Sequence, residues 1–167
     1  MSLVEYRPDD HATGGNILTL LVPTIADINK PTVAELSSGF SIDAAIESFE
    51  LSTDAKTESR KKLSDKVSTE TIGERTYKTG DTELLSDDPQ TVHAIEALLE
   101  PDTYVYMVMR PGKARSVPIA AGDRVWVNRQ QVVSRDAAEV NIDAGNNFGW
   151  KITWATKART YNGKVQA

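Results

Sequence analysis

The sequence of 167 residues contains no cysteine, which rules out disulfides and a thiol nucleophile. It also has no long hydrophobic run, because the longest apolar stretch, 104–109, is far shorter than the roughly 20 residues that span a bilayer. The first ten residues lack the basic start and apolar core of a secretory signal. We therefore expect a soluble protein with no membrane partner.

Basic residues are fewer than acidic ones: the chain has 19 Lys and Arg and 24 Asp and Glu, which gives a net charge of −5. A protein that holds nucleic acid by its phosphates normally carries the opposite sign. Direct DNA binding is therefore not expected. Two short basic segments, 60–62 and 110–115, are interpreted as solvated loop charges.

Signatures of catalysis and metal binding are missing as well. The segment 111–113 (Pro-Gly-Lys) lacks the upstream glycine of a phosphate-binding loop, and Ala114 stands where that motif needs Ser or Thr. The oxygen-rich segment 141–147 is interpreted as a turn, because Ile152 replaces the carboxylate that closes a calcium loop. Only two histidines are present. We predict no catalytic residue, no metal site and no cofactor, so the protein is not expected to be an enzyme.

Most of the chain has the apolar patterning of β-strands. The segment 104–109 (YVYMVM) is apolar at every position, which predicts a strand covered on both faces. The segment 79–81 is interpreted as a turn, and 128–130 as a polar break between two strands. The predicted strands are 17–22, 40–51, 67–78, 82–85, 104–109, 124–127, 131–133 and 150–155.

One helix is predicted at about 88–99. Asp88 can accept the first free amide hydrogens, and a proline follows it at the first helical position. An apolar stripe suited to packing on a sheet follows, and Pro101 ends the helix. The stripe consists of Val92, Ile95, Leu98 and Leu99. The fold class expected is mainly β, a β-sandwich or partly closed barrel with this flanking helix.

Composition divides the chain into an N-terminal arm at 1–16, a single β domain at 17–160 and a C-terminal tail at 161–167. The segment 52–66 (STDAKTESRKKLSDK) has one large apolar residue, Leu63, among many charged and hydroxyl side chains. Such a segment cannot offset its ordering entropy with a core of its own. We expect a mobile loop there.

The segment 21–42, LVPTIADINKPTVAELSSGFSI, joins a strand to a loop punctuated by two prolines and then to a second strand. It resembles the N-terminal signature of tail tube (major tail) proteins from long-tailed phages or prophages of actinobacteria. The segments 104–110 and 121–127 are similar to the second half of these proteins. The resemblance rests on Val22, Pro23, Thr24, Ile25, Ile28, Pro31, Thr32, Ala34, Glu35, Leu36 and Gly39. Seven of these define the family-signature loop: Pro23, Ile25, Pro31, Thr32, Glu35, Leu36 and Gly39.

The resemblance implies a structural virion protein that assembles with itself. Its relatives form rings, usually hexamers, which stack into a tube that conducts DNA without binding it specifically. The implied location is the virion tail, assembled in the host bacterial cytoplasm beside other tail proteins. We expect charged residues of the 52–66 loop to contact the next ring. These self-assembly residues are Lys56, Glu58, Arg60, Lys61, Lys62 and Asp65.

Two alternatives remain open from the sequence. One is another phage head or tail component, such as a decoration protein or a head-to-tail joining protein. The other is a carbohydrate-binding β-sandwich module, which needs an exposed aromatic platform. Trp150 and Trp154 share a strand face with Ile152, and that pattern is more typical of a core or an interface.

Overall fold

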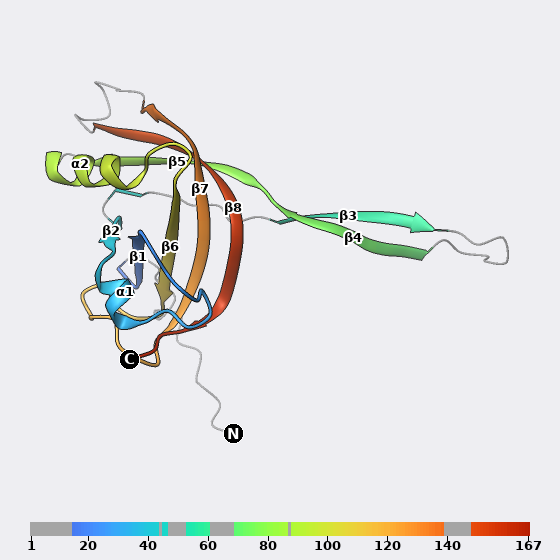
Figure 1. The fold of residues 1–167 in the computed structure, drawn as a ribbon, viewed down its shortest axis with the longest axis horizontal. Coiled ribbons are helices and arrows are strands. Elements are labelled where there is room, and N and C mark those ends of the chain that lie inside the picture. The colour runs from blue at the N-terminus through green and yellow to red at the C-terminus, as the bar shows by residue number, and fades with distance from the viewer. Residues whose placement is uncertain (1–14, 44, 47–52, 61–68, 87, 139–147) are drawn as a thin grey trace.

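The computed structural model describes residues 15–43, 45–46, 53–60, 69–86, 88–138 and 148–167 (Figure 1). The predicted N-terminal arm, apart from residues 15 and 16, and the predicted turn at 141–147 lie outside these residues. The strands are β1 (Ile17–Val22), β2 (Phe40–Ser41), β3 (Thr53–Arg60), β4 (Thr69–Tyr77), β5 (Thr79–Ser86), β6 (Tyr104–Pro111), β7 (Arg124–Ala137) and β8 (Phe148–Lys164). The helices are α1 (Val33–Ser37) and α2 (Pro89–Leu98).

Six strands form one antiparallel sheet in the order β2-β1-β6-β7-β8-β5. The sheet curls into a half-barrel, along which β7 and β8 run as long curved strands (Figure 1). Strands β3 and β4 form a separate two-stranded sheet. The prediction of a mainly β fold with one flanking helix at about 88–99 is confirmed.

Two hydrophobic clusters lie on opposite faces of the sheet, because neighbouring residues of a strand point to opposite sides. On β6, Met107 belongs to the first cluster and Val108 to the second. Ile95 of α2 packs into the first cluster, and Leu36 of α1 packs into the second. The two-sided cover predicted for 104–109 is therefore confirmed.

Helix α2 begins and ends where the sequence predicted. The Asp88 carboxylate accepts hydrogen bonds from the Gln90 and Thr91 amides, at 3.2 and 3.1 Å. The hydroxyl of Thr91 also donates to that carboxylate and is the main cause of a lowered Asp88 pKa. At the other end, Arg135 of β7 donates to the Glu96 carbonyl at 2.6 Å. A side chain of the sheet thus satisfies a helix carbonyl that has no partner within the helix.

The polar break predicted at 128–130 is wrong, because β7 runs through it without interruption. Asn128 and Gln130 are buried in this strand, and side chains of β8 bind both of them. Arg159 Nε donates to Asn128 Oδ1 at 2.8 Å, and the Thr156 hydroxyl donates to Gln130 Oε1 at 2.9 Å. The side-chain oxygens of these two polar residues are thus satisfied inside a central strand, whereas their amide nitrogens have no acceptor among the described residues.

Two other segments, 40–51 and 79–81, also fold differently from their sequence predictions. Among the described residues of the predicted strand 40–51, which exclude 44 and 47–51, only Phe40–Ser41 form a strand, β2. The amides of Ala45 and Ile46 both bond to the Ile42 carbonyl and turn the chain. The predicted turn at 79–81 is instead part of β5, where Gly80 pairs with Trp154 of β8. Pairing with a long neighbouring strand overrides the local turn preference.

The end of the chain is integrated into the fold where we expected a tail at 161–167. Residues 161–164 complete β8, and Val165 is buried in the second cluster. The Gln166 amide donates to the Pro31 carbonyl at 2.8 Å, and the Gln166 carbonyl accepts from Val33 at 3.0 Å. The C-terminus is therefore bound to the loop that precedes α1.

Candidate functional site

The β3–β4 hairpin projects from the sheet, past β8 and away from both helices (Figure 1). We expected a loop at 52–66, but residues 53–60 form strand β3. Each end of β3 pairs with β4, from Thr53 opposite Tyr77 to Arg60 opposite Thr69. Strand pairing satisfies the backbone groups of this segment without a hydrophobic core, so the absence of apolar residues does not make it a loop.

The structure places three of the predicted self-assembly residues on one strand. Lys56, Glu58 and Arg60 occupy alternate positions of β3. The register is irregular between residues 55 and 57 and regular beyond them, where Glu58 lies opposite Thr71. The other three, Lys61, Lys62 and Asp65, lie outside the described residues.

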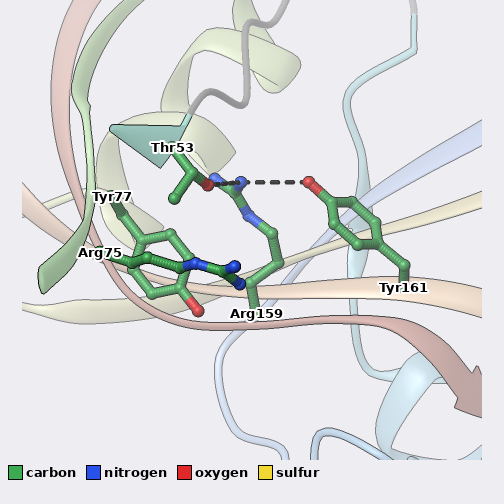
Figure 2. Close-up of a pocket in the computed structure, with 5 residues that line it drawn as sticks. All are labelled: Thr53, Arg75, Tyr77, Arg159 and Tyr161. Atoms are coloured by element: carbon green, nitrogen blue, oxygen red, sulfur yellow. Dashed lines mark hydrogen bonds between the residues drawn. The ribbon is translucent and has the colours of Figure 1, made fainter. Parts of the chain in front are cut away.

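A pocket of about 280 Å³ lies where the hairpin joins the sheet (Figure 2). We call it the hairpin-base pocket. Strand β3 contributes one lining residue, and β4 and β8 contribute two each. These residues are Thr53, Arg75, Tyr77, Arg159 and Tyr161.

Arg159 is the centre of this pocket. One of its terminal nitrogens, Nη1, donates to the Tyr161 hydroxyl at 3.1 Å and to the Thr53 hydroxyl at 3.4 Å (Figure 2). Its guanidinium carbon lies 4.9 Å from the centre of the Tyr77 ring, within the range of a cation–π interaction. Its Nε binds the fully buried Asn128. Besides the covalent continuation of β4 into β5, Arg159 of β8 thus connects the hairpin to the sheet.

Sequence reasoning did not identify these residues, because they come from three distant segments and form no motif. The only signal in the sequence is a shared spacing. Arg75 and Tyr77 are two residues apart, as are Arg159 and Tyr161. This spacing places each pair on one face of a strand.

The family-signature loop forms a structural cover over the second cluster. Ile25 and Leu36 are buried in that cluster. Thr32 and Glu35 form a capping box at the start of α1. Glu35 also accepts from the Ala26 amide at 2.8 Å, and this bond is the main cause of its lowered pKa.

Gly39 ends this loop at a position where a side chain has no room. A Cβ atom there would lie 2.7 Å from Cγ2 of Val22 and 3.1 Å from the Leu36 carbonyl oxygen. Pro31 is buried, whereas Pro23 at the other end of the loop is exposed. Most of the family-signature loop therefore serves packing.

The interpretation of 110–115 as solvated charges is wrong for Arg110, whose side chain is 1% exposed. It donates to the carbonyls of Ala114 and Val117, each at 2.8 Å, and lies 3.6 Å from the Asp123 carboxylate. Lys113 forms an ion pair with the same carboxylate. Burial raises the pKa of Asp123, but the hydrogen bonds from Lys113 and Ala120 and the two positive charges outweigh it, so the pKa is lowered. This network fixes the loop between β6 and β7.

The tryptophans of β8 do not form an exposed platform. Trp154 is buried in the first cluster, and Trp150 packs against that cluster beneath the Arg135 guanidinium, 4.9 Å from its ring centre. This arrangement gives no support to the carbohydrate-binding alternative.

Within the described residues, no group of three or more acidic or histidine side chains is placed to hold a metal ion. No helix in this part of the chain has the length and apolar character needed to cross a membrane.

A curled antiparallel sheet with a projecting hairpin defines a mainly β protein. The model of the phage tail tube protein family matches residues 6–167. The chain belongs to this family, which is structural and non-enzymatic. No curated protein matches it. The family match confirms the resemblance to tail tube proteins.

Proposed function

We propose that this chain is a tail tube subunit whose copies form rings, most simply hexamers, that stack into a tube conducting DNA. The proposal includes a long-tailed phage or prophage of an actinobacterium as its source, and other tail proteins as additional partners. Assembly would take place in the cytoplasm of the host bacterium. The observation that carries the proposal is the β3–β4 hairpin, which forms its own sheet outside the body of the protein.

A two-stranded hairpin on its own is at best marginally stable in water. Among the described strands, β3 pairs only with β4, so the outer edge of β3 has free backbone donors and acceptors. A surface of a neighbouring copy can satisfy these groups and cover the hairpin. The hairpin is therefore the element whose stability gains most from assembly.

The charged residues of this region supply orientation at the contact between rings. Lys56, Glu58 and Arg60 alternate in sign along β3, and Lys61, Lys62 and Asp65 follow them in the sequence. Exposed ion pairs add little affinity but disfavour wrong registers. We therefore assign these six residues to the alignment of successive rings.

Negative-stain microscopy of the concentrated protein tests the proposal. The full chain is expected to form hollow tubes. The matched variant replaces residues 55–75 with Asn-Gly, a two-residue turn that joins the paired positions Asp54 and Thr76. It is expected to keep the circular dichroism of the folded body and to form no tubes.

The outcomes separate the remaining candidates. Single rings or monomers from the full chain at every concentration would favour a joining or decoration protein. Tubes of normal length from the shortened variant would contradict the role of the hairpin while leaving tube assembly intact.

A further inference from the structure

The described residues that line the hairpin-base pocket are rich in hydrogen-bond donors and include no acidic side chain. None of its five lining residues carries a carboxylate. The side chain of Arg75, which extends toward Arg159 in Figure 2, makes no hydrogen bond or ion pair with the described residues. Two guanidinium groups therefore line one small space, and no carboxylate of the described lining residues lies between them.

The hydroxyl groups of the pocket also present protons. The oxygens of Tyr161 and Thr53 accept from Arg159, so the O–H bond of each is available to another acceptor. Nη2 of Arg159 also has no acceptor among the described residues. An oxyanion is the class of ligand that such a set of donors binds best.

We propose that the hairpin-base pocket binds a carboxylate side chain from a neighbouring copy of this chain. This inference rests on the proposed self-assembly. The chain has more acidic than basic residues, and Glu83, Glu100 and Asp102 are exposed and make no side-chain bond within the described residues. A second copy thus offers the charge that the pocket lacks.

The composition of the pocket also fits a contact between proteins. Arginine and tyrosine are the residues that most often dominate binding energy at such contacts. Tyr77 and Tyr161 remain 41% and 44% exposed, which leaves apolar ring surface for a neighbouring copy to cover. A DNA phosphate is the less favoured occupant, because the net charge of −5 opposes the approach of DNA.

The first test compares Arg75→Glu with Arg115→Glu in the full chain. Arg115 is an exposed arginine outside the pocket, and its side chain forms no ion pair among the described residues. We expect Arg75→Glu to raise the concentration threshold for sedimentable particles at least about tenfold, and Arg115→Glu to leave it unchanged. Both variants should keep the wild-type melting temperature of the unassembled chain. Equal thresholds for the two variants overturn the proposal.

The second test restores the charge pair. Glu83→Arg, Glu100→Arg and Asp102→Arg are each combined with Arg75→Glu. Recovery of the wild-type threshold by one combination supports the proposal and identifies the carboxylate.

The third test separates this inference from the proposed function. Inorganic phosphate is titrated into unassembled chain while the Arg159 Nε–H resonance is followed by NMR. If the full chain forms no particles at any concentration, the proposed function fails, and this titration decides the chemistry of the pocket. A saturable shift that Arg75→Glu abolishes supports an oxyanion site, and no shift overturns it. Phosphate binding together with normal assembly of Arg75→Glu overturns the neighbouring copy as the occupant.

Discussion

Single residues of the family-signature loop are constrained by space. Gly39→Ala places a methyl group 2.7 Å from Cγ2 of Val22, closer than packed carbon atoms approach. We expect it to lower the free energy of unfolding by about 1–3 kcal/mol, measured by urea denaturation. Adding Val22→Ala removes the clashing methyl group, so the double variant should be more stable than the sum of the two single effects predicts. If the effects of the two substitutions were strictly additive, the clash between residue 39 and Val22 would not be the cause of the destabilisation.

Asp123 is a buried residue whose ionisation should affect the stability of the fold. Its folded-state pKa is lowered from 3.8, so the ionised carboxylate stabilises the fold above pH 3.8, and this contribution is lost as the pH falls through the folded-state pKa. Asp123→Asn leaves the buried Arg110 without its counter-charge. We expect Asp123→Asn to lower the free energy of unfolding by about 3 kcal/mol at pH 7. This difference should shrink at acid pH, because the wild-type carboxylate then loses its charge as well.

Asp102→Asn is the matched control for this measurement. Asp102 is exposed, forms no ion pair among the described residues and has a φ of 65°, a conformation that asparagine also adopts readily. Its unfolding free energy should follow the wild type at every pH. A constant difference between Asp123→Asn and wild type across the acid range would contradict the ionic explanation.

The sequence contained the signals for some of these residue roles and lacked those for others. The spacing of Thr32 and Glu35 is that of a capping box, and both residues belong to the signature that identified the family. Arg110 and Asp123 form an ion pair, yet they lie 13 positions apart in the sequence (123 − 110), and the segment between them has the composition of a solvated loop. Only the folded path between β6 and β7 brings them together, and no local pattern encodes that path.

At the scale of elements, Arg135 connects helix α2 to the sheet. Its Nη1 donates to the Glu96 carbonyl at 2.6 Å while its guanidinium lies over Trp150. Arg135→Gln should lower the free energy of unfolding by about 1–2 kcal/mol, because the carbonyl of the last helical turn loses a charged donor. Urea denaturation followed by tryptophan fluorescence measures this change. Arg135→Lys keeps the charge but not the planar contact, so it should recover only part of the loss.

Elements were predictable from sequence where their own residues determine them. Helix α2 has its cap, proline and apolar stripe within twelve residues, and β6 is apolar at most positions. Strand β3 and the middle of β7 have polar sequences, and β4 and β8 supply the strands with which their backbones pair. Those partners are distant in the sequence, so a local pattern indicates a loop or a break where the folded chain has a strand.

At the scale of the whole molecule, the net charge affects whether DNA binds to the protein surface. The net charge of −5 opposes phosphate binding, and the buried ion pair of Arg110 removes one of the basic side chains from the surface. This balance is consistent with the proposed conduit, through which DNA would move without adhering.

We therefore expect linear duplex DNA to migrate unchanged on a gel after mixing with either unassembled or assembled protein at physiological salt. A basic DNA-binding protein of similar size serves as the positive control. If the protein slowed the DNA on the gel, and added salt steeply weakened this effect, the protein would have a local basic surface despite its negative net charge. The Arg75→Glu variant then locates that surface, because the described residues bring two arginines together without a carboxylate at the hairpin-base pocket. If the variant abolished the retardation, the pocket would be a phosphate contact, and the acidic balance of the molecule would not prevent DNA from adhering to it.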